Sequence, residues 1–184
     1  MTTAVRGVES VEDVWAAEDV NRAAWRTAFA DVFSPHVLAT GGAAASEPYI
    51  RSRYAVVRDH PGFVVATEGD DVVGYAYAAW TDTSRFVDDD EAELVELYVH
   101  PDHWGQGIGT RLLAAAEAAV PADRTSLVLA TPAGNDIGRS FYESRGFTVR
   151  ERRAGDVGGE VVPTVVFARA LSENQDDGSA STRA

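Results

Sequence analysis

The stretch "ELVELYVHPDHWGQGIGTRLL", residues 93–113, decides how the chain can fold. An apolar, β-rich run ends at His100-Pro101, and an amphipathic run begins a few residues later. Between the two runs stand three glycines at alternate positions, Gly105, Gly107 and Gly109. Proline cannot continue a strand ladder, and glycine allows a tight turn. The stretch therefore predicts a strand, a glycine-rich turn and a helix, in that order.

The glycine-rich turn has the properties of an anion-binding site. The first N–H groups of a helix have no acceptor within it, and the helix dipole favours negative charge at that end. Glycines also let an anion approach the backbone closely. Gly105–Thr110 therefore predicts a phosphate cradle, with a merely flexible turn as the alternative. The turn is not a Walker A loop, because no Gly-Lys-Ser/Thr follows, and Thr110 and Leu112 occupy the positions where a Rossmann fingerprint requires its last glycine.

The rest of the chain alternates between strand and helix patterns. The runs on either side of Gly69-Asp70-Asp71 read as a hairpin, and Ser10 is a candidate N-cap for the first helix. Strands are predicted over 4–8, 63–67, 72–80, 93–99, 125–131, 147–153 and 161–169, and helices over 11–33, 47–58, 106–120 and 135–146. This order predicts a mixed α/β sheet flanked by helices.

Composition limits the classes of protein to consider. The chain has 184 residues, 45% of them hydrophobic, which suits one domain over 1–171 followed by a polar, disordered tail over 172–184. A net charge of −13 argues against nucleic acid as a partner. The absence of a long apolar run and of a signal sequence argues against a membrane span and favours a cytoplasmic protein. Cysteine is absent and the four histidines show no metal-ligand spacing, so no disulfide, thiolate chemistry or metal site is expected.

Two motifs then resemble one family. "LYVHPDHWGQGIGTRLLAAAE", residues 97–117, resembles motif A of the GCN5-related N-acetyltransferase (GNAT) superfamily, whose pattern is Arg/Gln-x-x-Gly-x-Gly/Ala. "NDIGRSFYESRGF", residues 135–147, resembles its motif B, in which an Asn opens a helix and Phe-Tyr-Glu precedes Gly-Phe. The resemblance is strong over 72–169 and implies a GNAT-like, mostly antiparallel central sheet flanked by helices. Trp104 stands where the family pattern has Arg or Gln, so the side-chain contact from that position is not carried over.

The resemblance implies acetyl-CoA as the cosubstrate. Its pyrophosphate is expected on the N–H groups of Gln106–Thr110 and its pantetheine beside the strand that ends at Val99. In this family a β-bulge in that strand frees backbone groups, so an N–H group there is expected to polarise the thioester carbonyl. The residues expected at the cofactor are Leu97, Tyr98, Val99, Trp104, Gly105, Gln106, Gly107, Ile108, Gly109, Thr110, Asn135 and Tyr142.

Two glutamates on the central strand are candidates for the general base. A primary amine with a pKa near ~10.4 is neutral in only about one molecule in a thousand at pH 7, so attack on a thioester needs deprotonation. Glu93 is the first candidate, because it stands where histone acetyltransferases of the superfamily have their base. Glu96 is the second. On a regular strand the two face opposite sides of the sheet, unless a bulge lies between them. The alternative for both is a structural carboxylate paired with Arg or water.

Motif B supplies the candidate for the thiolate's proton. Tyr142 matches the tyrosine that serves as general acid in many relatives. Asn135 lies two helical turns earlier on the same face, about 10 Å away, and is expected to contact the pantetheine. The alternatives are an N-cap for Asn135 and a core position for Tyr142. Phe141 and Phe147 are assigned to the core.

The sequence thus predicts an N-acetyltransferase that moves an acetyl group from acetyl-CoA to a primary amine by direct attack. The alternative is a non-catalytic acyl-CoA-binding sensor or regulatory module. The acceptor, a small molecule or a peptide N-terminus, and the oligomeric state, a dimer included, stay open. The aromatic residues that can wall an acceptor pocket are Trp25, Phe29, Tyr77 and Trp80, with packing as the alternative.

Overall fold

The computed structural model describes residues 3–41 and 43–171, and the predicted disordered tail over 172–184 lies outside them. The described chain contains every strand and helix that the sequence predicts, together with the unpredicted helix α2 (Pro35–Gly41). Its elements are β1 (Thr3–Gly7), α1 (Val11–Ala28), α2 (Pro35–Gly41), α3 (Glu47–Val57), β2 (Phe63–Glu68), β3 (Asp71–Ala79), β4 (Ala92–Val99), the 3₁₀-helix η1 (Pro101–His103), α4 (Ile108–Ala118), β5 (Ser126–Pro132), α5 (Asp136–Glu143), β6 (Thr148–Val157) and β7 (Glu160–Ala170).

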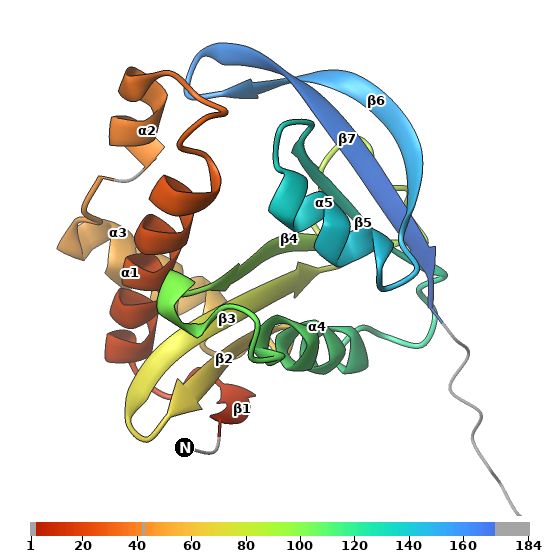
Figure 1. The fold of residues 1–184 in the computed structure, drawn as a ribbon. Helices are drawn as coiled ribbons and strands as arrows, with labels where there is room; N and C mark the ends of the chain where they lie inside the picture. The colour runs from red at the N-terminus through yellow and green to blue at the C-terminus, as the bar shows by residue number, and fades with distance from the viewer. Residues whose placement is uncertain (1–2, 42, 172–184) are drawn as a thin grey trace, which may run out of the picture.

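The strands form one sheet in the order β1-β2-β3-β4-β5-β7-β6 (Figure 1). Neighbouring strands are antiparallel throughout except for β4 and β5, which are parallel. The parallel pair stands in the middle of the sheet. Parallel neighbours need a crossover connection, and α4 lies in the segment that joins β4 to β5. The predicted fold class, a mixed and mostly antiparallel sheet flanked by helices, is confirmed.

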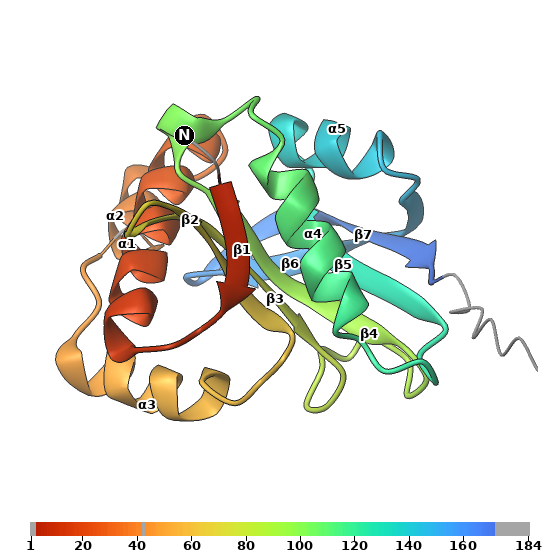
Figure 2. The same ribbon diagram turned by 90° about the horizontal axis from the view of Figure 1, so that it is seen from below.

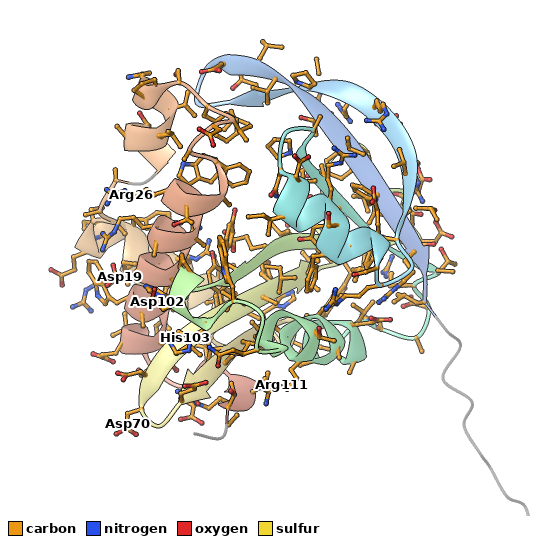
Figure 3. The ribbon with its side chains drawn as sticks, viewed as in Figure 1. Asp19, Arg26, Asp70, Asp102, His103 and Arg111 are labelled. Atoms are coloured by element: carbon orange, nitrogen blue, oxygen red, sulfur yellow. The ribbon has the colours of Figure 1, made fainter. Side chains whose placement is uncertain are left out.

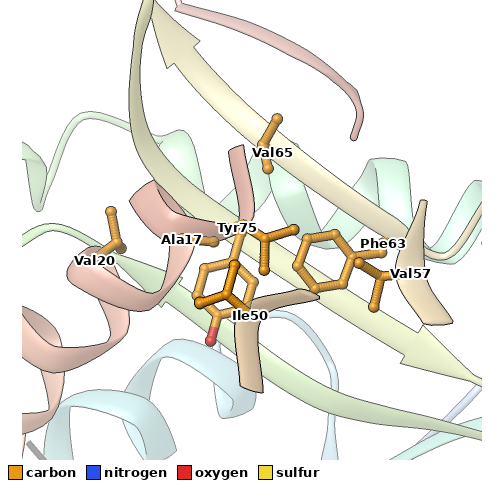
Figure 4. Packing of buried hydrophobic residues seen from close by; sticks show 8 residues of the cluster. Ala17, Val20, Ile50, Val57, Phe63, Val65 and Tyr75 are labelled. Atoms are coloured by element: carbon orange, nitrogen blue, oxygen red, sulfur yellow. The ribbon is translucent and has the colours of Figure 1, made fainter. Parts of the chain in front are cut away.

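Helices cover both faces of the N-terminal part of the sheet (Figure 2). On one face, α1 and α3 pack against Phe63 and Tyr75, whose rings stack 5.5 Å apart (Figure 4). On the other face, Leu112 of α4 packs against Val64 and Ala76. Neighbouring positions along β2 and β3 therefore belong to different clusters, as strands buried on both faces require.

The C-terminal hairpin of β6 and β7 reaches across to α2 (Figure 1). Val162, near the hairpin turn, is buried against Phe33 and Val37 of the α1–α2 segment. The hairpin at the far edge of the sheet is thus connected to the segment at the end of α1 and to α2. None of the helices in the described part of the chain is long and apolar enough to span a membrane.

The first predicted helix was extended too far. Its pattern continues to Phe33, but α1 ends at Ala28, and a turn leads to the unpredicted α2. Proline is favourable at the first position of a helix, so Pro35 fits the start of α2. This seven-residue helix depends on the burial of Val37 against the distant hairpin, and local patterns cannot reveal such a contact.

Two neighbouring valines at the end of α3 test the packing of this helix against the sheet. Val57 is 2% exposed, whereas its neighbour Val56 is 64% exposed. We expect Val57→Ala to lower the free energy of unfolding by about 2 kcal/mol, because it removes two buried methyl groups and leaves a cavity. Val56→Ala should change it by less than about 0.5 kcal/mol. Urea unfolding followed by circular dichroism measures both, and equal losses would contradict the packing described.

Candidate active site

The central parallel strands β4 and β5 pair only at their beginnings. Ala92 pairs with Leu127 and Glu93 with Val128, and the two strands diverge beyond these positions. From Leu94 onward the edge of β4 that faces β5 has no strand partner among the described residues. Free backbone groups at the carboxyl ends of diverging strands are a favoured place for ligands.

A β-bulge lies in β4 within this unpaired region. Glu96 pairs with Tyr77 and Leu94 with Ala78, so Val95 has no opposite residue on β3. Although it stands in the middle of the sheet, the Val95 side chain is 44% exposed. The extra residue also shifts the alternation of side chains by one, which brings Glu93 and Glu96 to the same face.

The glycine-rich turn follows β4 and η1, and at two of its positions the backbone adopts a conformation that favours glycine. Gly105 has φ +76° and Gly107, the N-cap of α4, has φ +78°, a region that side-chain-bearing residues rarely adopt. The first helical hydrogen bond runs from Arg111 N–H to the Gly107 carbonyl, 3.2 Å. The N–H groups of the first helical turn before Arg111 have no acceptor within the helix, and Ile108, Gly109 and Thr110 line the same cavity as the end of β4.

Two aromatic side chains shape the turn. The Trp104 indole N–H donates to the Val99 carbonyl, 2.7 Å, and so links the turn to the last residue of β4. A Cβ on Gly109 would lie 3.0 Å from the Phe141 ring, so the third glycine leaves room for α5 rather than for a left-handed backbone. Phe141, assigned to the core from the sequence, packs against the core and also lines the cavity at this point, whereas Phe147 is fully buried, as predicted.

A cavity of about 400 Å³ joins the end of β4, the glycine turn, α1 and α5. Its walls contain nearly all the residues predicted for the cofactor, and Gln106 is the exception. Those present are Leu97, Tyr98, Val99, Trp104, Gly105, Gly107, Ile108, Gly109, Thr110, Asn135 and Tyr142.

The two motif B residues that border this cavity, Asn135 and Tyr142, differ in their hydrogen bonds. The Asn135 side chain caps α5 by accepting the Gly138 N–H, 3.0 Å, and donates to the Thr131 hydroxyl, 2.9 Å. The N-cap alternative for Asn135 is therefore correct, although the residue also borders the cavity. The Tyr142 hydroxyl has no hydrogen-bond partner among the described residues, and burial raises the pKa of its phenol. Tyr142 thus offers a protonated hydroxyl to a ligand.

The two candidate bases lie on the bulged strand but do not line the cavity. The buried Glu93 carboxylate accepts both the N–H and the hydroxyl of Ser84, each at 2.7 Å. The Glu96 carboxylate binds the guanidinium of Arg53, which is also 3.0 Å from Glu18. Burial by itself would lower the pKa of Arg53, but Glu96 and its other neighbours raise it overall, so the guanidinium stays charged.

The predicted acceptor-pocket residues are distributed over three places. Phe29 lines the cavity, and the Trp25 ring stacks on Phe33 and lies tilted against Phe29 at the end of α1. Tyr77 and Trp80 both contact the ring of His60, which lies in the connection between α3 and β2. Of the four, Phe29 alone borders the cavity described here.

Sequence reasoning missed several residues of the cavity. The small side chains of Ala24 and Ala28 face it from α1, and their four-residue spacing before Phe29 was a usable signal. Arg145 also lines it, although a basic residue just before Gly146 reads as an ordinary helix C-terminal cation. The remaining missed residues are His103, Ile137, Gly138 and Phe141.

The family follows from a comparison of the sequence. A family model described as "Acetyltransferase (GNAT) family" matches residues 14–147, which include β4, the glycine turn and α5. The chain belongs to this family. Within residues 3–41 and 43–171 no group of three or more metal-ligating side chains comes together.

Solved GNAT structures share the fold. A GCN5-related N-acetyltransferase (Aminotransferase, Class-II) from Rhodopseudomonas palustris is 23% identical, with a TM-score of 0.70 over 93% of this chain and 97% of the other. PaiA N-acetyltransferase from Thermoplasma acidophilum, solved with coenzyme A, is 23% identical, with a TM-score of 0.66 over 93% and 100%. YncA from Salmonella typhimurium, solved with acetyl-CoA, is 20% identical, with a TM-score of 0.68 over 94% and 96%. No curated protein matches the chain.

The half-buried phenol of Tyr142 makes the free energy of unfolding depend on pH in the alkaline range. Burial raises its pKa, so above pH ~10 the unfolded chain loses this proton while the folded protein keeps it. The stabilisation is full below that pH and is lost as pH rises towards the folded pKa. Between pH 8 and pH 11 we expect the wild type to lose about 1 kcal/mol more unfolding free energy than Tyr142→Phe.

Urea titrations of both proteins at the two pH values measure this difference. The raised pKa of Tyr75 has causes that do not include Tyr142, so its contribution is the same in both proteins and cancels in the comparison. Tyr142 is one cause of the raised pKa of Tyr98, so the comparison reports on Tyr142 together with its effect on Tyr98. An equal loss in wild type and variant would contradict the buried, protonated state of Tyr142.

Proposed function

We propose that this chain is an N-acetyltransferase that transfers the acetyl group of acetyl-CoA to a primary amine by direct attack. The observation that carries the proposal is a single cavity bordered by the glycine turn, the end of the bulged strand β4 and the hydroxyl of Tyr142. Acetyl transfer from acetyl-CoA needs three groups in one place: hydrogen-bond donors for the phosphates, a donor that polarises the thioester carbonyl and a donor to the departing sulfur.

The donor would lie along this cavity. The N–H groups at the start of α4 suit the pyrophosphate, because both their direction and the helix dipole favour an anion. The pantetheine would continue past Val99 and Leu97 towards the bulge at Val95. There the edge of β4 without a strand partner can donate an N–H to the thioester carbonyl, which gains negative charge as the amine attacks.

Tyr142 would donate to the departing sulfur. Burial raises the pKa of its phenol, so the hydroxyl stays protonated at neutral pH and can hydrogen-bond the CoA thiolate. An unperturbed thiol, near ~8.5, is already a stronger acid than a phenol, near ~10. Tyr142 therefore serves as a hydrogen-bond donor during bond cleavage. The CoA thiolate takes up a proton as the products separate.

The acceptor's proton would pass to a carboxylate on β4. Glu93 is our first candidate, because its only partner among the described residues is the neutral Ser84, which can exchange for water or an amine. Glu96 is the second, because the charged Arg53 holds its carboxylate. The acceptor itself, a small molecule or a peptide N-terminus, is expected to approach from the face that the bulge gives to both glutamates.

The activity is tested by release of CoA thiol from acetyl-CoA in the presence of different amines. The panel contains polyamines, amino acids, aminoglycosides, aryl amines and short peptides with free N-termini. Acceptor-dependent release, with the acetylated amine identified by mass spectrometry, is the expected result. Binding of acetyl-CoA without release for any amine would support the alternative, an acyl-CoA-binding sensor, and absence of binding would contradict the phosphate cradle.

Two variants separate the enzyme from the sensor. With the best amine, Tyr142→Phe and Glu93→Gln should each lower kcat by about 10²-fold or more. Glu93→Gln removes the proton acceptor, and Tyr142→Phe removes the hydrogen-bond donor to the departing thiolate. Their affinity for CoA, measured by calorimetry, should stay within about threefold of the wild type. Ser84→Ala is the control for Glu93→Gln, because it removes the hydroxyl hydrogen bond to that carboxylate without removing the carboxylate. Unchanged turnover in both variants would show that neither residue takes part in the reaction.

A further inference from the structure

The walls of the cavity carry very little charge of their own. Among the described residues that line it there is no carboxylate, although the whole chain has a net charge of −13. Arg145 and His103 are the two lining side chains that can be cationic. His103 Nδ1 lies 3.7 Å from the Glu68 carboxylate, so this side chain already has an anionic neighbour. Arg145 is therefore the cation that the cavity can offer to an anionic ligand.

The guanidinium of Arg145 is held at the start of α4. Its Nε lies 3.2 Å from the Thr110 hydroxyl, which a second nitrogen also contacts, and a third donates to the Phe141 carbonyl, 2.8 Å. The guanidinium carbon sits 3.6 Å from the centre of the Phe141 ring. That ring in turn packs on Gly109, where a Cβ would come within 3.0 Å. The third glycine of the turn thus allows Phe141 to support Arg145 beside the free N–H groups.

The pairing of Arg145 differs from that of most other arginines. Most of them form an ion pair with a carboxylate, as Arg6 does with Asp13 and Arg169 with Glu117. No carboxylate among the described residues comes within ion-pair distance of Arg145, and its partners are all neutral oxygens. A guanidinium that is fixed in place, faces a cavity and lacks a counter-ion is suited to bind an anion.

The other arginine close to the turn points elsewhere. Arg111 belongs to the same helix as Thr110, but its guanidinium extends towards β1 and donates to the Thr3 carbonyl, 3.2 Å (Figure 3). The arginine nearest to the glycine turn in sequence is therefore not the one whose guanidinium lies beside the turn. The arginine that reaches the turn comes from the end of α5 instead.

We propose that Arg145 binds the pyrophosphate of the acyl donor together with the N–H groups of the glycine turn, and so makes the site specific for nucleotide-bearing thioesters. This inference rests on the proposed function, since it concerns the same cavity. A phosphate oxygen between the guanidinium and the start of α4 would receive charge-assisted hydrogen bonds from one side and backbone hydrogen bonds from the other. A donor that ends at the pantetheine would gain nothing from either.

Isothermal titration calorimetry of Arg145→Gln tests the inference with three ligands: CoA, 3′-dephospho-CoA and pantetheine. We expect the affinity for CoA and for dephospho-CoA to fall by about tenfold or more, because both contain the pyrophosphate. Pantetheine binding should stay within about twofold of the wild type. Arg145→Lys should recover part of the loss, because it keeps the charge without the planar fork. Wild-type affinity for CoA should also fall more steeply with salt than that of Arg145→Gln.

Arg111→Gln is the matched control, because it removes the same charge from the neighbourhood of the turn without touching the cavity. Its affinity for CoA should stay within about twofold of the wild type. The unfolding midpoint of each variant without ligand reports on folding. If Arg145→Gln does not fold, Arg145→Lys carries the test, because loss of the planar fork should lower its affinity for CoA but not for pantetheine relative to the wild type.

The outcomes separate this inference from the proposed function. If the wild type binds no CoA, the proposed function fails. If the wild type binds CoA and Arg145→Gln binds it equally well, the role of Arg145 fails alone. A loss for CoA but not for dephospho-CoA would assign the guanidinium to the 3′-phosphate and overturn the pyrophosphate assignment. An equal loss for pantetheine would make Arg145 a structural residue.

Discussion

The pairing of β4 with β5 at only two positions is the constraint on which the rest of the structure depends. Ala92–Leu127 and Glu93–Val128 join the two halves of the sheet, and everything beyond them diverges. A strand edge left open inside a protein needs partners for its N–H and C=O groups. The divergence therefore creates a space that polar ligand atoms can satisfy, and it aims the ends of both strands, with the helices that follow them, at that space.

The bulge at Val95 acts together with that divergence. By adding one residue to β4, it places Glu93 and Glu96 on one face instead of two. Buried carboxylates need partners, and the chain supplies a different one to each: the neutral Ser84 for Glu93 and the charged Arg53 for Glu96. The bulge thus places the two carboxylates on the same face of the sheet. Their partners make them differ in how readily they accept a proton, because a neutral partner is displaced more easily than a charged one.

The sequence predicted those features that depend on local chemistry. The glycines and His100-Pro101 fixed the strand–turn–helix order, because only such residues suit those backbone conformations. Contacts between distant segments were out of reach. The helix at Pro35–Gly41 depends on the C-terminal hairpin. Phe141 packs against the core as predicted, but its ring also reaches the cavity wall, because a glycine in another helix leaves room for it. The position of the bulge depends on strand register, which apolar patterns in β4 do not encode.

Trp104 illustrates how a motif can change without losing its geometry. A backbone cradle needs its N–H groups to converge, and convergence depends on how firmly the turn is attached to the strand before it. The indole N–H provides that attachment by binding the Val99 carbonyl at the end of β4. The side chain at this position therefore positions the donors, while the helix start supplies them. Because the two tasks are separate, a position that usually carries a polar contact can accept an aromatic ring, provided that positive charge reaches the turn from another element.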